Sequence, residues 1–251
     1  MNAEVKRQLI ALNRTFYQTF GQAFAEKRQR LQPGVRRVIE RFRGDERILD
    51  LGCGNGELAR QLARRGHRAP YLGLDFSPSL LEEAGRLNLN FPAVFLQLDL
   101  TSPDWERALA CHLTGADDPT ALVGRWDVVT AFAVLHHIPG HDLRLSILRK
   151  VRSLLPTGGR FWHSEWMFLN SPRLRARVQD WSLIGLSSQD VDEGDYLLDW
   201  RHGGRGLRYV HHFTPAELAG LAGESGFVIV ETFSSDGKGG RLGLYQEWEA
   251  R

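Results

Sequence analysis

Cysteine and long apolar runs are both scarce in this sequence. Its 251 residues include only two cysteines, Cys53 and Cys111, which cannot form a disulfide framework and do not have the spacing of metal ligands. No apolar run reaches the roughly 18 residues that a membrane-spanning helix needs. The first residues do not lead into the apolar segment of a secretory signal either. We therefore expect a cytoplasmic protein that makes no contact with a membrane.

Composition and charge indicate a globular protein with an uneven distribution of basic residues. The chain is 42% hydrophobic and 25% charged, which is ordinary for soluble proteins, and its length suits one large α/β domain with additions. The formal net charge is +2, yet residues 1–43 hold ten Lys and Arg against three acids. We expect residues 1–43 to form an N-terminal helical arm, which Asn13 or Gly21 would break, and 44–251 to form the main domain. The basic residues of the arm form either a solvated helix face or a surface for a polyanion.

The glycine-rich turn at 52–56 is the most informative part of the sequence. Residues 48–57 read Ile-Leu-Asp-Leu-Gly-Cys-Gly-Asn-Gly-Glu, which is typical of a strand, a tight turn and the start of a helix. Glycines let a ligand approach the backbone closely, and the first turn of a helix presents unpaired N–H groups. A dinucleotide fingerprint needs its third glycine where Glu57 stands. The spacing therefore favours a nucleoside without a pyrophosphate.

Strand and helix patterns alternate along most of the chain. Strand patterns occur at 47–50, 71–76, 93–98, 126–133, 160–166, 227–233 and 242–248. Residues 167–210 lose this rhythm, and we expect them to form an inserted lid with one helix around 173–184. The last two strands are joined too closely to be parallel. The order predicts a doubly wound, mostly parallel seven-stranded α/β sheet that ends in an antiparallel hairpin.

Acidic residues stand at the ends of the first three predicted strands. A doubly wound sheet binds ligands across the carboxyl ends of its strands, so Asp50, Asp75 and Asp99 should lie around one crevice. Asp75 can accept hydrogen bonds from both hydroxyls of a ribose, or else it caps the following helix. Asp99 can accept from an adenine amino group while Leu100 supplies a backbone N–H, or else it too is a helix cap. Phe76 is placed to stack on a base.

Four short blocks occur in order along the central part of the chain. They are Leu-Asp-Leu-Gly-Cys-Gly-Asn-Gly (49–56), Gly-Leu-Asp-Phe-Ser (73–77), Leu-Asp-Leu (98–100) and Ala-Val-Leu-His-His-Ile-Pro (133–139). Together they resemble the signature of class I S-adenosylmethionine-dependent methyltransferases, which have a Rossmann-like fold. The resemblance implies S-adenosylmethionine as cofactor.

The same resemblance implies a role for each block. Asp50 and the glycine-rich turn would hold the methionine part of the cofactor, and the turn consists of Gly52, Cys53, Gly54, Asn55 and Gly56. Asp75 would bind the ribose, and Asp99 with Leu100 the adenine. The segment from Phe132 to His137 would pass beneath the transferable methyl group.

The flanking segments have a narrower resemblance. Gly-Asp-Tyr-Leu-Leu-Asp-Trp (194–200) and Leu-Arg-Tyr-Val-His-His-Phe-Thr-Pro-Ala-Glu-Leu (207–218) are similar to segments of the tRNA wobble-uridine carboxymethyl methyltransferases. Phe-Ala-Glu-Lys-Arg (24–28) resembles the segment in which that family places an active-site arginine, here Arg28. The chain departs from that family's Val-Pro-Trp and Tyr-Tyr-His motifs. This resemblance implies tRNA as a partner, with a small activator protein as in the eukaryotic members, and a small-molecule acceptor is the alternative.

Different methyl acceptors require different catalytic residues. A sulfonium methyl is already activated, so the protein mainly aligns the acceptor and excludes water. A carboxylate acceptor needs cations to place it, for which Arg28, Arg201 and Arg208 are candidates. A hydroxyl or amine acceptor needs a general base, for which His136 or His137 is the first choice. The histidines lack the spacing and the carboxylates of a metal site, so we expect no metal.

Tryptophan, tyrosine and arginine are frequent in the insertion, and this pattern has two interpretations. These side chains either stack on and clamp a single-stranded nucleotide, or they form the apolar core and the charged rim of a lid. A third interpretation of the whole chain is a non-catalytic scaffold with the cofactor fold. The acids at 50, 75 and 99 disfavour a scaffold, which has no need of them.

Overall fold

Seven strands form one sheet in the order β3-β2-β1-β4-β5-β10-β9. The structure is a computed structural model that describes residues 1–26 and 31–251. The strands are β1 (Ile48–Leu51), β2 (Tyr71–Asp75), β3 (Ala93–Gln97), β4 (Val128–Phe132), β5 (Arg160–Trp166), β9 (Phe227–Ser235) and β10 (Gly243–Ala250). The first five are parallel, and β10 runs antiparallel between β5 and β9. The predicted doubly wound sheet with its terminal hairpin is confirmed.

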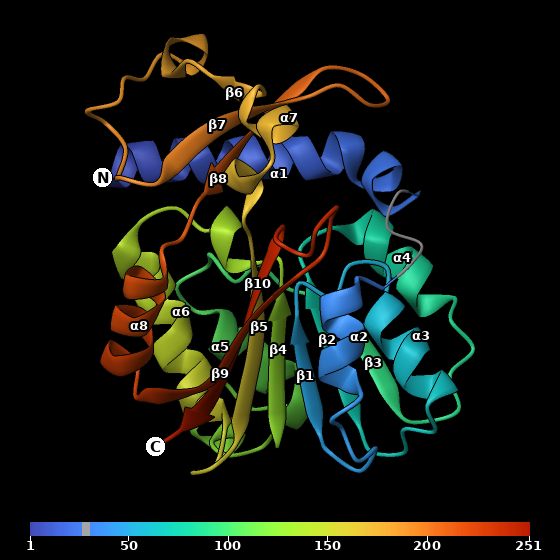
Figure 1. The fold of residues 1–251 in the computed structure, drawn as a ribbon. Helices are drawn as coiled ribbons and strands as arrows, with labels where there is room; N and C mark the ends of the chain where they lie inside the picture. The colour runs from blue at the N-terminus through green and yellow to red at the C-terminus, as the bar shows by residue number, and fades with distance from the viewer. Residues whose placement is uncertain (27–30) are drawn as a thin grey trace.

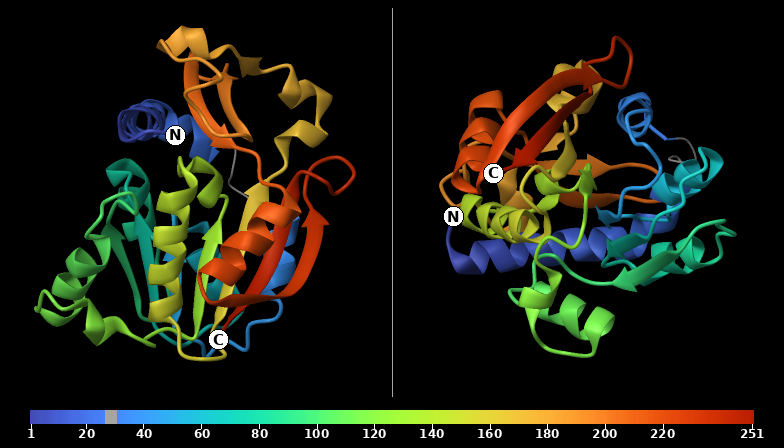
Figure 2. Two further views of the ribbon diagram at one scale, coloured as in Figure 1. Left: turned by 90° about the vertical axis from the view of Figure 1, so that its left-hand side faces the viewer. Right: turned by 90° about the horizontal axis from the view of Figure 1, so that it is seen from below.

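Helices cover both faces of this sheet (Figures 1 and 2). They are α2 (Pro33–Ile39), α3 (Glu57–Arg64), α4 (Pro78–Gly85), α5 (Trp105–Thr114), α6 (His141–Leu154) and α8 (Pro215–Glu224), with short 3₁₀ turns η1 (Pro119–Leu122) and η2 (Leu135–His137). Side chains of α2 and α3 share one core cluster with the sheet, and those of α5, α6 and α8 share the other. Strands buried on both faces are typical of a parallel sheet between helical layers.

The first helix, α1 (Ala3–Glu26), is continuous through Asn13 and Gly21, where the sequence predicted a break. Asn13 does not disturb the helix because its side chain bonds to the backbone of Tyr209 instead of to its own turn. Gly21 lies within the helix as well, and a Cβ there would be in ordinary van der Waals contact with the hydroxyl of Ser77 at 3.8 Å. Asn13 therefore serves the docking of α1.

The insertion forms a small antiparallel sheet. The prediction of one helix around 173–184 is therefore wrong. It contains η3 (Phe168–Asn170), α7 (Pro172–Arg175), β6 (Val178–Gln179), η4 (Trp181–Ile184), β7 (Asp195–Trp200) and β8 (Gly206–His211), with sheet order β6-β7-β8. Helix α7 already ends at Arg175. After β6, the carboxylate of Asp180 accepts from the Ser182 N–H and starts a separate turn. The strands are specified by long-range pairing, which a local pattern does not reveal.

Helix α1 packs against this small sheet, and we call α1 together with β6, β7 and β8 the cap. Phe16 and Phe20 of α1 pack on Trp200, and Val5 and Leu9 pack around another side chain of the small sheet, the buried Tyr209. Figure 1 shows the cap lying across one end of the seven-stranded sheet. In the described part of the chain, no helix combines the length and the apolar character needed to cross a lipid bilayer.

Candidate active site

A cavity of about 460 Å³ lies between the carboxyl ends of the parallel strands and the cap. This volume is in the range of small-molecule and cofactor sites. The predicted cofactor residues on its wall are Asp50, Gly52, Cys53, Gly54, Asn55, Asp75, Phe76, Asp99, Leu100 and Phe132. Helix α1 contributes Ile10, Asn13, Arg14 and Tyr17 to the opposite wall. The sequence therefore identified residues on one side of the cavity and none of the four that α1 contributes to the other.

The glycine-rich turn brings bare backbone to the cavity. Gly52 and Gly54 have φ angles of 70° and 55°, which glycine adopts without strain, and a Cβ at Gly54 would meet no atom within 4 Å. Gly56 is different, because it is absent from the cavity wall. A Cβ on Gly56 would lie 2.7 Å from Leu87, so this glycine allows close packing between helices and does not contact a ligand.

Asp75 ends β2 with its carboxylate on the cavity wall. Its two oxygens accept the backbone N–H groups of Gly54 and Ser77, both at 2.9 Å, and burial raises its pKa. A carboxylate has about four acceptor positions, so two remain for a ligand such as a ribose diol. The N-cap residue of α4 is Ser77, and Asp75 supports that turn from outside the helix.

Asp50 lies deeper, below the glycine-rich turn. The hydroxyl of Tyr71 donates to its Oδ2 at 2.5 Å, and that of Thr130 donates to its Oδ1 at 2.6 Å. Burial raises the pKa of Asp50 to about 6, although both hydrogen bonds act in the opposite direction. Asp50 is thus mostly ionised at neutral pH at an energetic cost, and a cation entering the cavity would offset that cost.

Asp99 lies at the far end of the cavity and contacts α1. It accepts the N–H and the hydroxyl of Thr101 at 2.8 and 2.6 Å, and it forms an ion pair with Arg14. It does not cap α5, whose N-cap residue is Asp104. Leu100 and Phe76 line the cavity beside it, so the predicted adenine residues lie together.

His137 faces the cavity from η2 and contacts one side chain and one backbone carbonyl of the cap. Its Nδ1 lies 3.5 Å from the carbonyl oxygen of Tyr209, and its Nε2 lies 2.7 Å from the hydroxyl of Tyr17. A carbonyl can only accept, so this contact favours the tautomer with the proton on Nδ1, in which the Nε2 lone pair accepts from Tyr17. In that tautomer Nε2 is the basic nitrogen.

His136 was predicted as an alternative base, and the structure places it elsewhere. It is 1% exposed, does not line the cavity, and its Nδ1 lies 3.0 Å from Glu165. The other oxygen of Glu165 lies 3.0 Å from His163. Burial raises the pKa of Glu165 well above its usual range and lowers that of His163 to about 3. His136 itself thus lies behind the cavity wall, within hydrogen-bond distance of the Glu165 carboxyl.

The predicted arginine candidates do not line the described cavity. Arg208 is buried with its guanidinium 4.8 Å from the ring of Trp166 and 5.3 Å from that of Phe16, which is a cation–π position. Arg201 is on the exposed rim and donates to Asp199. Arg28 lies outside the described residues. Arg14 is the only lysine or arginine among the described residues of the wall, and it is paired with an acid.

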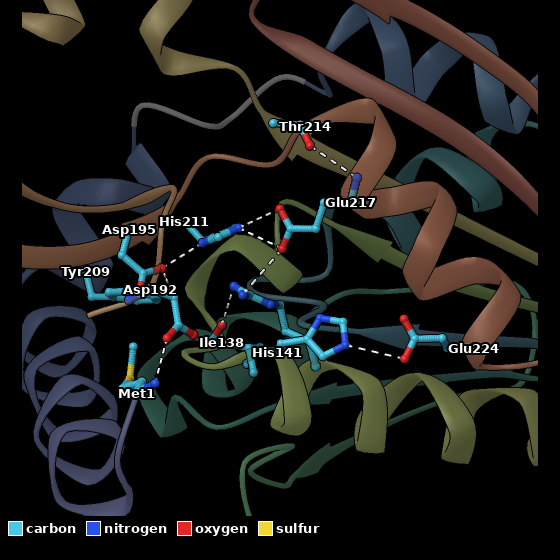
Figure 3. Close-up of polar contacts among 11 residues, drawn as sticks. Met1, Ile138, His141, Asp192, Asp195, Tyr209, His211, Thr214, Glu217 and Glu224 are labelled. Atoms are coloured by element: carbon cyan, nitrogen blue, oxygen red, sulfur yellow. Dashed lines mark hydrogen bonds and ion pairs between the residues drawn. The ribbon is translucent and has the colours of Figure 1, made fainter. Parts of the chain in front are cut away.

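A buried chain of alternating charges joins the cap to the core (Figure 3). His211 in β8 lies 2.6 Å from Asp195 in β7 and 2.9 Å from Glu217 in α8, and Glu217 pairs with Arg144 of α6 at 3.5 Å. Burial alone would lower the pKa of His211, but the hydrogen bonds to Asp195 and Glu217 raise it. Thr214 caps α8 by accepting the Glu217 N–H at 3.1 Å.

Metal ligands do not gather around the cavity or elsewhere in the described ranges. Within residues 1–26 and 31–251, no group of three or more His, Cys, Asp or Glu side chains has the geometry to hold a metal ion. The chemistry of the wall is that of carboxylates, backbone N–H groups, one imidazole and aromatic rings.

A model of the methyltransferase domain family matches residues 24–232, most of the chain. The chain belongs to this family of methyltransferases. Its relatives include trans-aconitate 2-methyltransferase of Pseudomonas paraeruginosa, 38% identical over 45% of this chain and 34% of that protein. Ubiquinone biosynthesis O-methyltransferase of Thiobacillus denitrificans is 28% identical over 74% of this chain and 66% of that protein. A bifunctional biotin biosynthesis protein of Bordetella avium is 29% identical over 70% and 34%. This chain thus matches between about a third and two thirds of the length of these relatives.

Solved methyltransferases have the same fold. A methyltransferase from Methanosarcina mazei superposes with a TM-score of 0.63 at 22% identity, covering 88% of this chain and 98% of its own. Magnesium protoporphyrin IX methyltransferase from Synechocystis, solved with S-adenosylmethionine, gives a TM-score of 0.58 at 17% identity, and both chains are covered completely. The predicted enzyme class is confirmed, and S-adenosylmethionine as its cofactor is supported.

Proposed function

We propose that this methyltransferase transfers the methyl group of S-adenosylmethionine to a hydroxyl group of a small molecule, with His137 as general base. The observation that carries the proposal is the cavity wall itself. Predicted cofactor residues occupy one part of it, and an imidazole with its Nε2 lone pair toward the cavity side occupies another.

The residues present fit the cofactor. The bare backbone at Gly52 and Gly54 suits the methionine part, and the two remaining acceptor positions of Asp75 suit the ribose. Asp50 and Asp75 give the site negative potential for a cationic sulfonium. When bound, the cofactor supplies an activated methyl group.

The chain's own task is then to hold an acceptor in line and take its proton. As the hydroxyl oxygen bonds to the methyl carbon, the carbon–sulfur bond breaks and its electron pair stays on sulfur. His137 takes the hydroxyl proton on Nε2 and becomes an imidazolium, whose Nδ1–H donates to the Tyr209 carbonyl. General bases of this kind contribute about 10²–10⁴-fold in rate. The hydroxyl of Tyr17 occupies the acceptor's place in the ligand-free protein.

Charge on the wall favours a hydroxyl over a carboxylate acceptor. Aligning a carboxylate needs a cation, and in the described part of the wall the only arginine or lysine is Arg14, which Asp99 already neutralises. Aromatic side chains of neighbouring strands line the cavity, namely Phe132, Trp166 and Tyr245. Aromatic rings suit contact with a planar hydroxylated ring, and the name of the ubiquinone O-methyltransferase relative agrees with this acceptor class.

A tRNA acceptor is supported less well than a small molecule. Ion pairs to carboxylates beyond residue 43 hold five of the seven described basic residues of the arm, namely Lys6, Arg14, Arg37, Arg41 and Arg43. Their charge is thereby compensated locally, which leaves less field for a polyanion. In the insertion, Trp200 and Tyr209 are buried against α1, as the lid-core interpretation expects.

Methyl transfer from a labelled cofactor tests the proposal. The protein is incubated with S-adenosylmethionine carrying a labelled methyl group, separately with a small-molecule extract and with total tRNA, and the products are analysed by mass spectrometry. Labelled methyl ethers that disappear in His137→Gln support the proposal. A matched control is His141→Gln, a half-exposed histidine that contacts Glu224 and should retain activity. Labelled tRNA nucleosides, or a labelled methyl ester, would contradict it.

A further inference from the structure

One polar residue stands in the middle of the face that α1 turns toward the small sheet and the cavity. Asn13 is only 6% exposed, and its helix neighbours Leu9 and Phe16 belong to apolar clusters. A buried amide is costly unless its donors and acceptor are satisfied. Its partners therefore show what it is for.

The side chain of Asn13 binds two backbone segments at once. Its Oδ1 accepts the Tyr209 N–H at 2.9 Å, and its Nδ2 donates to the Tyr209 carbonyl at 3.1 Å and to the His137 carbonyl at 3.2 Å. The amide thus pairs with β8, the outer strand of the cap sheet, as a neighbouring strand would. Its second N–H connects this strand to η2.

Tyr209 is held at both of its ends. Asn13 fixes its backbone, and its hydroxyl donates to Asp195 at 2.7 Å, a side chain that is itself held by His211 (Figure 3). The Tyr209 carbonyl therefore has little freedom to turn. It is the same carbonyl that lies 3.5 Å from Nδ1 of His137.

We propose that Asn13 is a positioning residue that selects the Nδ1–H tautomer of His137. It holds the main chain of His137 and, through Tyr209, a carbonyl acceptor within reach of the Nδ1 proton. The tautomer of a histidine is set by the hydrogen bond that its other nitrogen makes. With Nδ1 protonated, the Nε2 lone pair faces Tyr17 and the cavity. The inference rests on the proposed function, because a preferred tautomer matters for catalysis only if His137 is the general base.

Nuclear magnetic resonance can read the tautomer without any acceptor substrate. In protein labelled with ¹⁵N-histidine at about pH 8, long-range proton–nitrogen spectra distinguish a protonated ring nitrogen from an unprotonated one, and His137→Gln identifies the His137 signals. We expect wild-type His137 to be protonated at Nδ1. In Asn13→Leu, which has a similar shape but no amide, we expect a shift to the Nε2–H form. Asn13→Ala serves as a second variant if Asn13→Leu does not fold.

Two control variants separate positioning from simple docking of α1. Lys6→Ala removes an ion pair between α1 and Asp142 of the core but touches neither His137 nor Tyr209, so the tautomer should not change. Tyr17→Phe removes the donor on Nε2. If Tyr17→Phe abolishes the Nδ1–H preference and Asn13→Leu leaves it intact, the tautomer is set by Tyr17 and the proposal is wrong.

Kinetics on an identified hydroxyl acceptor give the second readout. Asn13→Leu should lower kcat about 10-fold or more, because part of the general-base contribution is lost, while KM and cofactor affinity change less than about 2-fold. An unchanged tautomer in both Asn13 variants overturns the inference whatever the acceptor is. A wild-type Nδ1–H tautomer together with no methyl transfer to any hydroxyl would instead contradict the proposed function and leave the role of Asn13 in place.

Discussion

Replacement of Asp50 by asparagine should stabilise the ligand-free protein at neutral pH. Burial raises the pKa of Asp50 from 3.8 to about 6, and a pKa that differs by one between the folded and unfolded states corresponds to about 1.4 kcal/mol. Keeping this carboxylate ionised in the folded state therefore costs about 3 kcal/mol above pH 6. The side-chain oxygen of asparagine can still accept from one of the hydroxyls of Tyr71 and Thr130, and its NH2 group can donate to the other. The replacement therefore loses only about 1 kcal/mol of hydrogen-bond energy. The net gain is about 2 kcal/mol.

The pH dependence follows from the raised pKa of the folded state. The folded protein holds the Asp50 proton up to about pH 6, whereas the unfolded chain releases it near 3.8. The stability that the neutral carboxyl provides is complete below the unfolded pKa and is lost as the pH rises through the folded pKa. The advantage of Asp50→Asn should therefore be full at pH 7.5 and fall below about 1 kcal/mol at pH 4.

Thermal unfolding of the ligand-free protein measures the effect. A gain of about 2 kcal/mol corresponds to a rise in Tm of roughly 4–8 °C for a protein of this size. Asp127→Asn is a control of opposite sign, because its side-chain hydrogen bond from Arg47 lowers the pKa of Asp127, so this variant should lose stability at pH 7.5. A Tm of Asp50→Asn that equals or falls below the wild-type value at pH 7.5 would refute the reasoning. Asp50→Asn should also bind S-adenosylmethionine more weakly, since it lacks the negative charge that attracts the sulfonium.

Four other substitutions test separate parts of the structure. Asp75→Asn should weaken binding of the cofactor product S-adenosylhomocysteine about 10–100-fold in calorimetry, because hydrogen bonds to a charged acceptor are lost. Glu165→Gln should gain stability in thermal unfolding relative to the wild type as the pH rises, since burial raises the pKa of Glu165 and only the wild-type protein bears the cost of ionising this carboxyl. His211→Gln should lower the Tm at pH 6, with a smaller loss at higher pH, because the raised pKa of His211 means that its stabilisation is present below about 6.5 and lost through the folded pKa. Gly34→Ala should destabilise by about 1–3 kcal/mol in denaturant unfolding, since its Cβ would lie 2.2 Å from the Tyr245 ring.

The sheet and the cofactor side of the cavity could be predicted because their signals are local. Strands β1, β2 and β4 are short apolar runs buried on both faces, and the acids at 50, 75 and 99 lie at or near strand ends. Parallel topology then brings those ends together. Gly56 was assigned to the ligand because a turn motif cannot show which of its glycines faces a helix and which faces a cavity.

The cap side was not predictable because it depends on long-range contacts. Strands β7 and β8 pair across a turn in the insertion, and α1 docks on them from almost 200 residues away, as in the contact of Asn13 with Tyr209. His136 and His137 are neighbours in sequence, but the 3₁₀ turn η2 directs one behind the wall and one onto it. A single apolar periodicity does not distinguish them. The asparagine inside the apolar face of α1 is the one signal available, and taken by itself it indicates a helix break.

The joining of α1 to the small sheet by apolar side chains limits how such an enzyme can be re-engineered. Phe16 and Phe20 cover Trp200, so a chimera that takes a new insertion from a relative but keeps this first helix would leave mismatched rings exposed to water. The two segments, distant in the gene, have to be exchanged together if acceptor preference is to be transplanted. Libraries built to change the substrate should therefore diversify both ends of this contact within the same clone.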